Sequence, residues 1–147
     1  MIDFEEDNLE KLTISKLKKV ADYWLRKVLL KEAKTKSGLY FCPIKNKYYP
    51  ESKIQVAHFI DRGYSMWTRY NRVNCNLISE SSNVWDSRIM VEGFKSKHHK
   101  EYEDFLIEKF GKDVIEYLKT LASKKELMYK EDYIKIIKDL KDEYTSV

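Results

Sequence analysis

The chain has 147 residues, of which 43% are apolar and 35% charged, with only four glycines and two prolines. This length supports one hydrophobic core, and the composition predicts a folded, helix-rich domain rather than a disordered chain. There is no apolar run of about 18 residues, and the opening MIDFEEDNLE is acidic where a secretory signal is basic and then apolar. We therefore expect a cytoplasmic protein with no membrane partner, in which Cys42 and Cys75 form no disulfide framework.

The net charge of +4 is unevenly distributed along the chain. Residues 36–100 contain 11 Lys or Arg and 5 Asp or Glu, so this segment carries +6 and the two flanks together carry −2. A basic middle segment is typical of proteins that bind a phosphate backbone. The charge favours a nucleic-acid partner, although many proteins of similar charge bind no nucleic acid.

Residues 13–36 have the spacing of an amphipathic helix. Thr13 or Ser15 can cap its first turn, and Ser37-Gly38 can end it. The apolar face is expected to be part of the core and consists of Leu17, Val20, Ala21, Trp24, Leu25, Val28 and Leu29.

The helical spacing is lost after Leu39 and returns near residue 96. Between these points the aromatic and β-branched pieces LYFC, KYYP, IQVAHFI and RVNCNLI alternate with turn residues, which predicts short strands. Residues 96–145 predict three further helices, with apolar faces around Tyr102 to Phe110, Val114 to Leu121 and Tyr133 to Tyr144. The sequence predicts one α+β domain over residues 1–147, with a small β region at 39–95 between an N-terminal helix and C-terminal helices.

Polar residues with catalytic potential lie within the predicted β region. His58 belongs to IQVAHFI, Asn74 and Asn76 alternate along RVNCNLI, and Asn83 follows where the chain can enter a helix. This order suits a single-metal phosphodiesterase, in which His58 is the general base for a water and the Asn74 amide orients the imidazole. Asn83 would then offer an oxygen to a hard cation. The alternatives are a hydrogen-bonded structural histidine, and asparagines that satisfy the backbone of turns.

The run AHFIDRG, followed by TRY, Asn74 and then Asn83, resembles the phage Rap/NinG recombination-protein family, a branch of the HNH (ββα-metal) nucleases. In that alignment His58 falls on the catalytic His, and Asn74 and Asn83 fall on the two motif asparagines. Arg62, Gly63, Thr68 and Arg69 match further motif positions. The resemblance extends over most of residues 15–145 and implies an HNH-like ββα-metal core.

The zinc knuckle of that family is mostly lost from this chain. Its four cysteine positions are occupied here by Cys42, Lys45, Ser79 and Ser82. One thiolate cannot hold a tetrahedral zinc, so we expect no structural zinc and a knuckle region held by packing instead.

The catalytic metal implied by the resemblance is Mg²⁺ or Mn²⁺. Many HNH sites carry a ligand immediately before the catalytic His, but Ala57 occupies that position. Asn83, Asp61 and His98 are therefore the candidate metal ligands. Asp61 would face away from His58 unless the chain turns first. His98 and His99 are expected to open the next helix, where a solvated helix start is the alternative role.

The resemblance implies a metal-dependent DNA endonuclease, a hydrolase of phage recombination type that acts on branched or single-strand-containing DNA such as a Holliday junction. Phosphate contacts would come from Arg62, Arg69, Arg72 and Lys97. A homodimer would suit symmetric cleavage of a junction. The alternative hypotheses are a non-catalytic DNA-binding recombination accessory protein and a helical interaction module with no DNA role.

Overall fold

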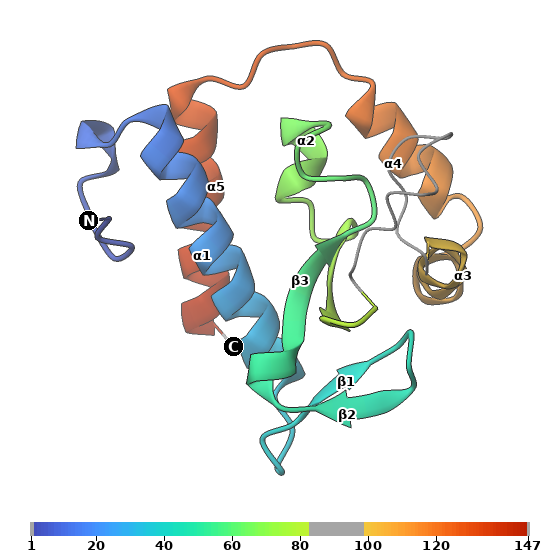
Figure 1. The fold of residues 1–147 in the computed structure, drawn as a ribbon. Helices are drawn as coiled ribbons and strands as arrows, with labels where there is room; N and C mark the ends of the chain where they lie inside the picture. The colour runs from blue at the N-terminus through green and yellow to red at the C-terminus, as the bar shows by residue number, and fades with distance from the viewer. Residues whose placement is uncertain (1, 83–98, 147) are drawn as a thin grey trace. The chain divides into compact units, whose positions relative to one another are not determined.

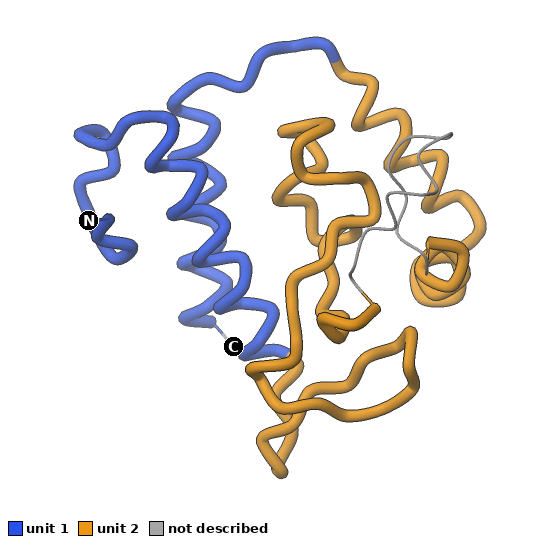
Figure 2. Tube along the Cα trace, in the orientation of Figure 1, with its two compact units in different colours: residues 1–32, 125–147 blue, residues 33–124 orange. Residues whose placement is uncertain are grey.

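The computed structural model describes residues 2–82 and 99–146 and shows a mixed α+β fold (Figure 1). The chain forms two compact units (Figure 2): residues 1–32 with 125–147, and residues 33–124. A single domain over residues 1–147 stays a prediction, because one domain can contain two compact units.

The first unit is built from helices at opposite ends of the chain. It contains a short 3₁₀ turn at Leu9–Lys11, helix α1 at Ile14–Ala33 and helix α5 at Lys130–Ser146. The Thr13 hydroxyl accepts a hydrogen bond from the Lys16 amide at 3.2 Å, so Thr13 is the N-cap of α1. The seven apolar residues predicted for the face of this helix are all buried.

Aromatic contacts hold the two helices of this unit together. The Trp24 ring meets the Tyr144 ring edge-on, with centroids 5.6 Å apart, and the Trp24 indole donates to the Phe4 carbonyl at 2.9 Å. The Lys31 ammonium donates to the Tyr144 carbonyl near the end of α5. On α5 the buried side chains are Tyr133, Ile134, Ile137 and Leu140.

The second unit contains two separate antiparallel hairpins. Strand β1 (Tyr40–Cys42) pairs with β2 (Lys47–Tyr49), and β3 (Ile54–His58) pairs with β4 (Cys75–Ser79). A 3₁₀ turn at Glu51–Lys53 leads from β2 into β3. These are the four strands that the sequence predicts, with the difference that Asn74 precedes β4 instead of lying within it.

Three helices complete the second unit. The short helix α2 (Met66–Arg69) follows the loop after β3, α3 spans His99–Phe110, and α4 spans Val114–Ala122. Helix α4 packs against both α2 and α3, and β1 packs against β4. Gly111, with a φ of +105°, ends α3 in a backbone conformation that favours glycine.

The helix bounds differ from the sequence predictions by a few residues at their ends. Helix α1 ends at Ala33 rather than at residue 36, and α5 starts three residues before Tyr133. In the ranges 2–82 and 99–146, no helix combines the length and apolar character that a membrane crossing requires.

Candidate active site

His58 is the last residue of β3 and lies opposite Cys75 at the start of β4. The strand alternation buries Ala57 and leaves the His58 side chain half-buried, at the end of the hairpin where the chain enters a loop. The ring atom Nε2 lies 2.9 Å from the backbone carbonyl oxygen of Arg69, the last residue of α2. The imidazole is therefore held by a backbone atom of the helix that follows the loop.

This contact determines which ring nitrogen of His58 carries the hydrogen. A carbonyl oxygen can only accept a hydrogen bond, so Nε2 must be the donor. In the neutral imidazole the lone pair then belongs to Nδ1, which is the nitrogen that can accept a proton from water. The Arg69 carbonyl thus performs the orienting role that the sequence analysis assigned to Asn74.

The prediction that the Asn74 amide holds the imidazole is wrong. Asn74 is fully buried, and its Oδ1 accepts from the Ile60 amide at 2.8 Å. Its Nδ2 donates to the Ile60 carbonyl at 3.1 Å and to the Thr68 carbonyl at 3.0 Å. The Asn74 side chain thus bonds to the backbone at the start of the loop, at Ile60, and in the helix that follows it, at Thr68. Asn74 therefore positions the loop and α2, and through the Arg69 carbonyl it acts on His58 only indirectly.

The loop between β3 and α2 is ordered by short-range hydrogen bonds. The Asp61 carboxylate accepts from the Gly63 amide at 3.2 Å, and the Tyr64 amide donates to the Asp61 carbonyl at 2.9 Å. Ser65 caps α2 by accepting from the Trp67 amide at 3.1 Å. Asp61 thus lies in a turn three residues after His58, and its carboxylate contacts the Gly63 amide of that turn. The role of Asp61 as a metal ligand is not tested by these contacts and stays a prediction.

Two exposed side chains project from this ordered loop. Arg62 is exposed, and Tyr64 has 75% of its surface accessible, the largest exposure of any large apolar side chain that the structure describes. Asp61 and Ser65, the residues on either side of this segment, both form hydrogen bonds within the loop. These bonds hold the backbone that carries the Tyr64 ring and the Arg62 guanidinium. The exposure of Tyr64 was not predicted from the sequence, where a tyrosine between Gly and Ser carries no distinguishing signal.

The other predicted phosphate-binding arginines are Arg69, the last residue of α2, and Arg72, which lies between α2 and β4. Arg69 is half-buried at the end of α2, with its guanidinium carbon 5.5 Å from the centre of the Tyr70 ring. Arg72 is half-buried in the turn before β4. Lys124 adds a further cation near α2, because its ammonium lies 3.7 Å from the centre of the Trp67 ring. The structure thus brings several cations to the α2 region.

A buried tyrosine connects the candidate site to α3. The Tyr102 hydroxyl lies 2.9 Å from the Ala57 carbonyl and 3.1 Å from the Asn74 carbonyl, either of which it can donate to. It also accepts from the Asn76 side chain at 3.1 Å. Burial raises the pKa of Tyr102 well above its ordinary value, so the hydroxyl stays protonated and remains a donor. The helical spacing predicts Tyr102 on an apolar face and carries no signal of these polar contacts.

The first residue of α3 also packs beside the site. The His99 ring stacks on the Phe59 ring, with centroids 4.5 Å apart, and Phe59 directly follows His58. His99 begins α3, as the sequence predicts. The predicted metal ligands Asn83 and His98 and the predicted phosphate contact Lys97 lie outside the described residues. Within the described parts of the chain, no group of three His, Cys, Asp or Glu side chains is arranged to hold a metal ion.

Three of the four knuckle positions come together as a hydrogen-bonded cluster. The Cys42 thiol donates to the Ser79 hydroxyl at 3.5 Å and accepts from the Ser79 amide at 3.3 Å. The Ser79 hydroxyl in turn lies 3.0 Å from the Ser82 hydroxyl. Cys42, Ser79 and Ser82 are all buried. Hydrogen bonds between small side chains therefore join β1 to the end of β4.

The same contacts affect the ionisation of Cys42. Burial of the thiol opposes ionisation, but its hydrogen bonds with the Ser79 amide and side chain and with the amides of Lys45 and Ile44 outweigh it. The pKa of Cys42 is consequently lowered from its ordinary value. The hydrogen bonds around this sulfur thus make its ionisation easier than that of a free cysteine.

Comparison with family models, with curated proteins and with solved structures found no match for this chain.

Proposed function

We propose that this protein is a metal-dependent DNA endonuclease of phage recombination type, built on an HNH-like core and acting on branched or single-strand-containing DNA. The observation that carries the proposal is the contact of His58 Nε2 with the Arg69 carbonyl at 2.9 Å. This contact leaves Nδ1 as the basic nitrogen of the imidazole. His58 lies at the end of the β3–β4 hairpin, next to the loop that carries the exposed Arg62.

In this proposal His58 acts as the general base for hydrolysis of a phosphodiester. Nδ1 takes a proton from water as the water oxygen bonds to phosphorus, and the bond from phosphorus to the leaving oxygen breaks. The resulting imidazolium keeps its hydrogen bond from Nε2 to the Arg69 carbonyl, and this acceptor stabilises the positive ring. The leaving oxygen receives a proton from the ring or from solvent, which completes the reaction.

The metal that such chemistry requires would be Mg²⁺ or Mn²⁺. The proposed ligands are Asp61, whose carboxylate is of the type that a hard cation prefers, together with Asn83 and His98. When bound, the cation would stabilise the charge that develops on the phosphate and on the leaving oxygen.

The cations around α2 support a role in holding DNA. In the proposal, Arg62, Arg69 and Arg72, together with Lys97, contact phosphates on either side of the cleaved bond. Contacts of this kind release counterions, so the affinity should fall steeply as salt is raised. A homodimer would allow two strands of a junction to be cut symmetrically.

Tyr64 favours DNA with unpaired bases as the substrate. An aromatic ring exposed on a fixed loop loses little conformational freedom when a base stacks on it, and stacking requires a base that is out of the duplex. Arg62 lies two residues away and can contact the adjoining phosphate. This pair is the reason to test branched and single-stranded substrates before duplex.

The test is a cleavage assay on an end-labelled four-way junction, a single strand and a linear duplex, each with Mg²⁺, Mn²⁺ or chelator. We expect cleavage in either metal, none with chelator, and a loss of about 10²- to 10⁴-fold in His58→Ala, because a general base typically contributes that much. The matched control is Gln55→Ala, an exposed position on the same strand, which should cleave normally.

A DNA-binding accessory protein without cleavage is the alternative. Both hypotheses predict binding that weakens with salt, so mobility shifts with His58→Ala are measured beside the cleavage assay. Binding without cleavage in every metal would refute the nuclease in favour of the accessory protein. No DNA binding at moderate salt would refute both and favour an interaction module.

A further inference from the structure

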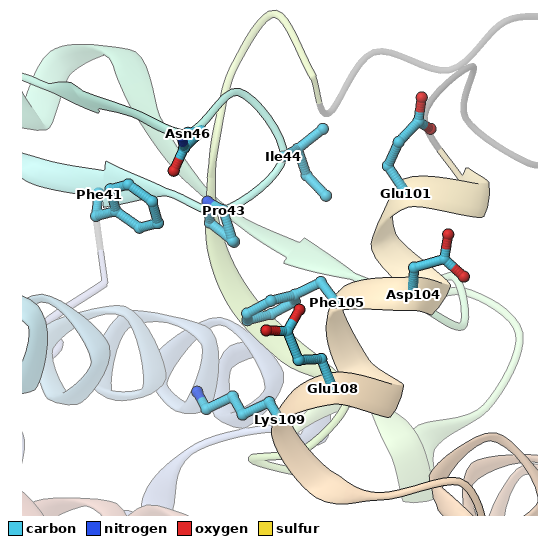
Figure 3. A pocket seen from close by; sticks show the side chains of 9 residues that line it. All are labelled: Phe41, Pro43, Ile44, Asn46, Glu101, Asp104, Phe105, Glu108 and Lys109. Carbon is cyan, nitrogen blue, oxygen red and sulfur yellow. The ribbon is translucent and has the colours of Figure 1, made fainter.

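A groove lies between the β1–β2 hairpin and helix α3. It has a volume of about 600 Å³. Figure 3 shows Phe105 and Glu108 reaching from α3 toward the hairpin, while Phe41, Pro43 and Ile44 form the opposite side. All of its lining residues belong to the second unit.

The floor of the groove is apolar and accessible. Phe41 has 40% of its surface exposed, and Pro43, Ile44 and Phe105 are half-buried. The Phe41 ring packs against the Tyr48 ring with centroids 5.2 Å apart, and Tyr48 is itself 58% exposed. Aromatic and aliphatic surface of this kind can bury one or two large apolar side chains of a ligand.

The rim of the groove is acidic. Glu101, Asp104 and Glu108 recur at i, i+3 and i+7 along α3 and line one side, with Lys109 as the only cation among the lining residues that the structure describes. These described lining residues carry −2 in a chain whose net charge is +4. Glu108 forms no ion pair with any residue that the structure describes, whereas Asp104 pairs with Lys100 at 2.9 Å. This charge repels a phosphate backbone and attracts a cationic chain.

Lys109 shows how a cation binds here. Its ammonium lies 5.6 Å from the centre of the Phe105 ring and 5.1 Å from the centre of the Phe110 ring. The protein thus places one of its own cations against the aromatic surface beside the rim carboxylates. A lysine or arginine of a ligand would find the same combination of ring face and carboxylate.

We propose that this groove is the docking site for a cationic amphipathic segment of a partner protein. The segment would place a large apolar side chain between the hairpin and Phe105, and its lysines or arginines beside Glu101, Asp104 and Glu108. Helical segments bind grooves in this way through apolar anchors at i, i+3, i+4 and i+7. The proposal is independent of the nuclease activity, because none of the described residues that line the groove belongs to the candidate active site.

The probe is a fluorescein-labelled synthetic helix of about 14 residues, long enough for those anchors, with leucines on one face and lysines on the other. One control peptide replaces each lysine with glutamate, and another replaces each leucine with serine. Anisotropy titrations of the full chain should show binding of the first peptide only. Amide chemical shifts should change mainly at residues 41–46 and 101–109.

The protein variants separate groove binding from general charge attraction. Glu101→Gln, Asp104→Asn and Glu108→Gln together remove three rim charges, and we expect about tenfold weaker binding, since each exposed pair contributes modestly. The control combines Glu116→Gln, Glu126→Gln and Glu131→Gln, three exposed residues outside the groove with the same total charge. It should bind within about twofold of the unaltered protein.

Two further single variants test the floor and the competing cation. Phe41→Ser should weaken binding by about tenfold, and Lys109→Gln should strengthen it by about twofold, because a like charge leaves the groove. Equal binding by the two triple variants would overturn the proposal. So would equal binding of the glutamate peptide, shift changes elsewhere, or self-association of the chain that Phe41→Ser abolishes, which would assign the groove to a second copy.

Discussion

The two hairpins of the second unit use their side chains in opposite ways. Every residue of β4 is buried, and the β3–β4 pair is surrounded by buried polar groups that bond to each other and to backbone. The β1–β2 pair is shorter, and it leaves the Phe41 and Tyr48 rings exposed. One hairpin therefore uses its side chains to hold a loop in place, whereas the other buries Tyr40 and Cys42 and presents the Phe41 and Tyr48 rings to solvent.

This difference explains how a small unit can position a reactive side chain. A buried polar group is costly when it has no partner, so a fully bonded set of them permits few alternative arrangements. Asn74 and Tyr102 supply such a set beside His58, whereas the exposed Phe41 and Tyr48 rings of β1–β2 contact each other without a buried hydrogen bond. Precise placement should therefore depend on the β3–β4 hairpin, and the comparison can be tested by altering each hairpin in turn.

The largest expected effect is that of Asn74→Ala. It removes three hydrogen bonds and takes away the Asn74 partner of the Ile60 amide and the Ile60 carbonyl, so the free energy of unfolding should fall by about 3–4 kcal/mol. Urea denaturation measures this change. The matched control is Asn46→Gly in the β1–β2 turn, where the residue is exposed and has a φ of 55°. That change should be close to neutral. Similar losses in both variants would refute the contrast between the hairpins.

Tyr102→Phe should have the next largest effect. It removes only the hydroxyl, leaves the Asn76 side chain and one carbonyl of the hairpin with fewer partners, and should cost about 2 kcal/mol by urea denaturation. Tyr48→Phe, which removes an exposed hydroxyl from the other hairpin, should change the stability by less than about 0.5 kcal/mol.

The pH dependence of Tyr102 gives a second measurement of the same contact. Folding raises the pKa of Tyr102 above its ordinary value of 10.0, so the unfolded chain releases this proton first as the pH rises. Stability is then lost above pH 10, by up to about 1.4 kcal/mol per pH unit for one group. The unaltered protein should therefore lose stability more steeply in this range than Tyr102→Phe. Equal slopes would show that the hydroxyl is not buried as described.

Periodicity predicted most of the fold because it depends on local spacing. The seven buried residues of α1 follow from their i, i+3, i+4 pattern, and the four strands follow from aromatic and β-branched runs bounded by turns. The site was less predictable. The acceptor for His58 is the Arg69 backbone carbonyl, which carries no side-chain signal, and its position depends on where α2 ends. The residue type and chain position of Asn74 indicate a role near His58, but its hydrogen-bond partners depend on how the loop between β3 and α2 folds.

Tyr64→Ala should show whether the exposed Tyr64 ring contributes to DNA binding without contributing to stability. Tyr64 is 75% exposed, so the unfolding free energy should change by less than about 0.5 kcal/mol. If a base stacks on the ring, affinity for a single strand should fall about tenfold, while Tyr64→Phe keeps a stacking face and stays near the unaltered protein. Both are measured in a His58→Ala background, where binding is free of cleavage. Single-strand binding that Tyr64→Ala leaves intact would refute stacking but not the nuclease.

Tyr48→Ala on the exposed hairpin should also have only a small effect on stability. It removes the ring contact with Phe41, and a cross-strand aromatic pair at the surface contributes only about 0.5 kcal/mol. Thermal unfolding of the variant and of Gln55→Ala, an exposed change on β3, should therefore give similar small shifts. A loss above about 2 kcal/mol would mean that the aromatic face supports the fold. A small loss leaves Phe41 and Tyr48 as apolar surface that the fold does not need, which is the condition for a partner to use it.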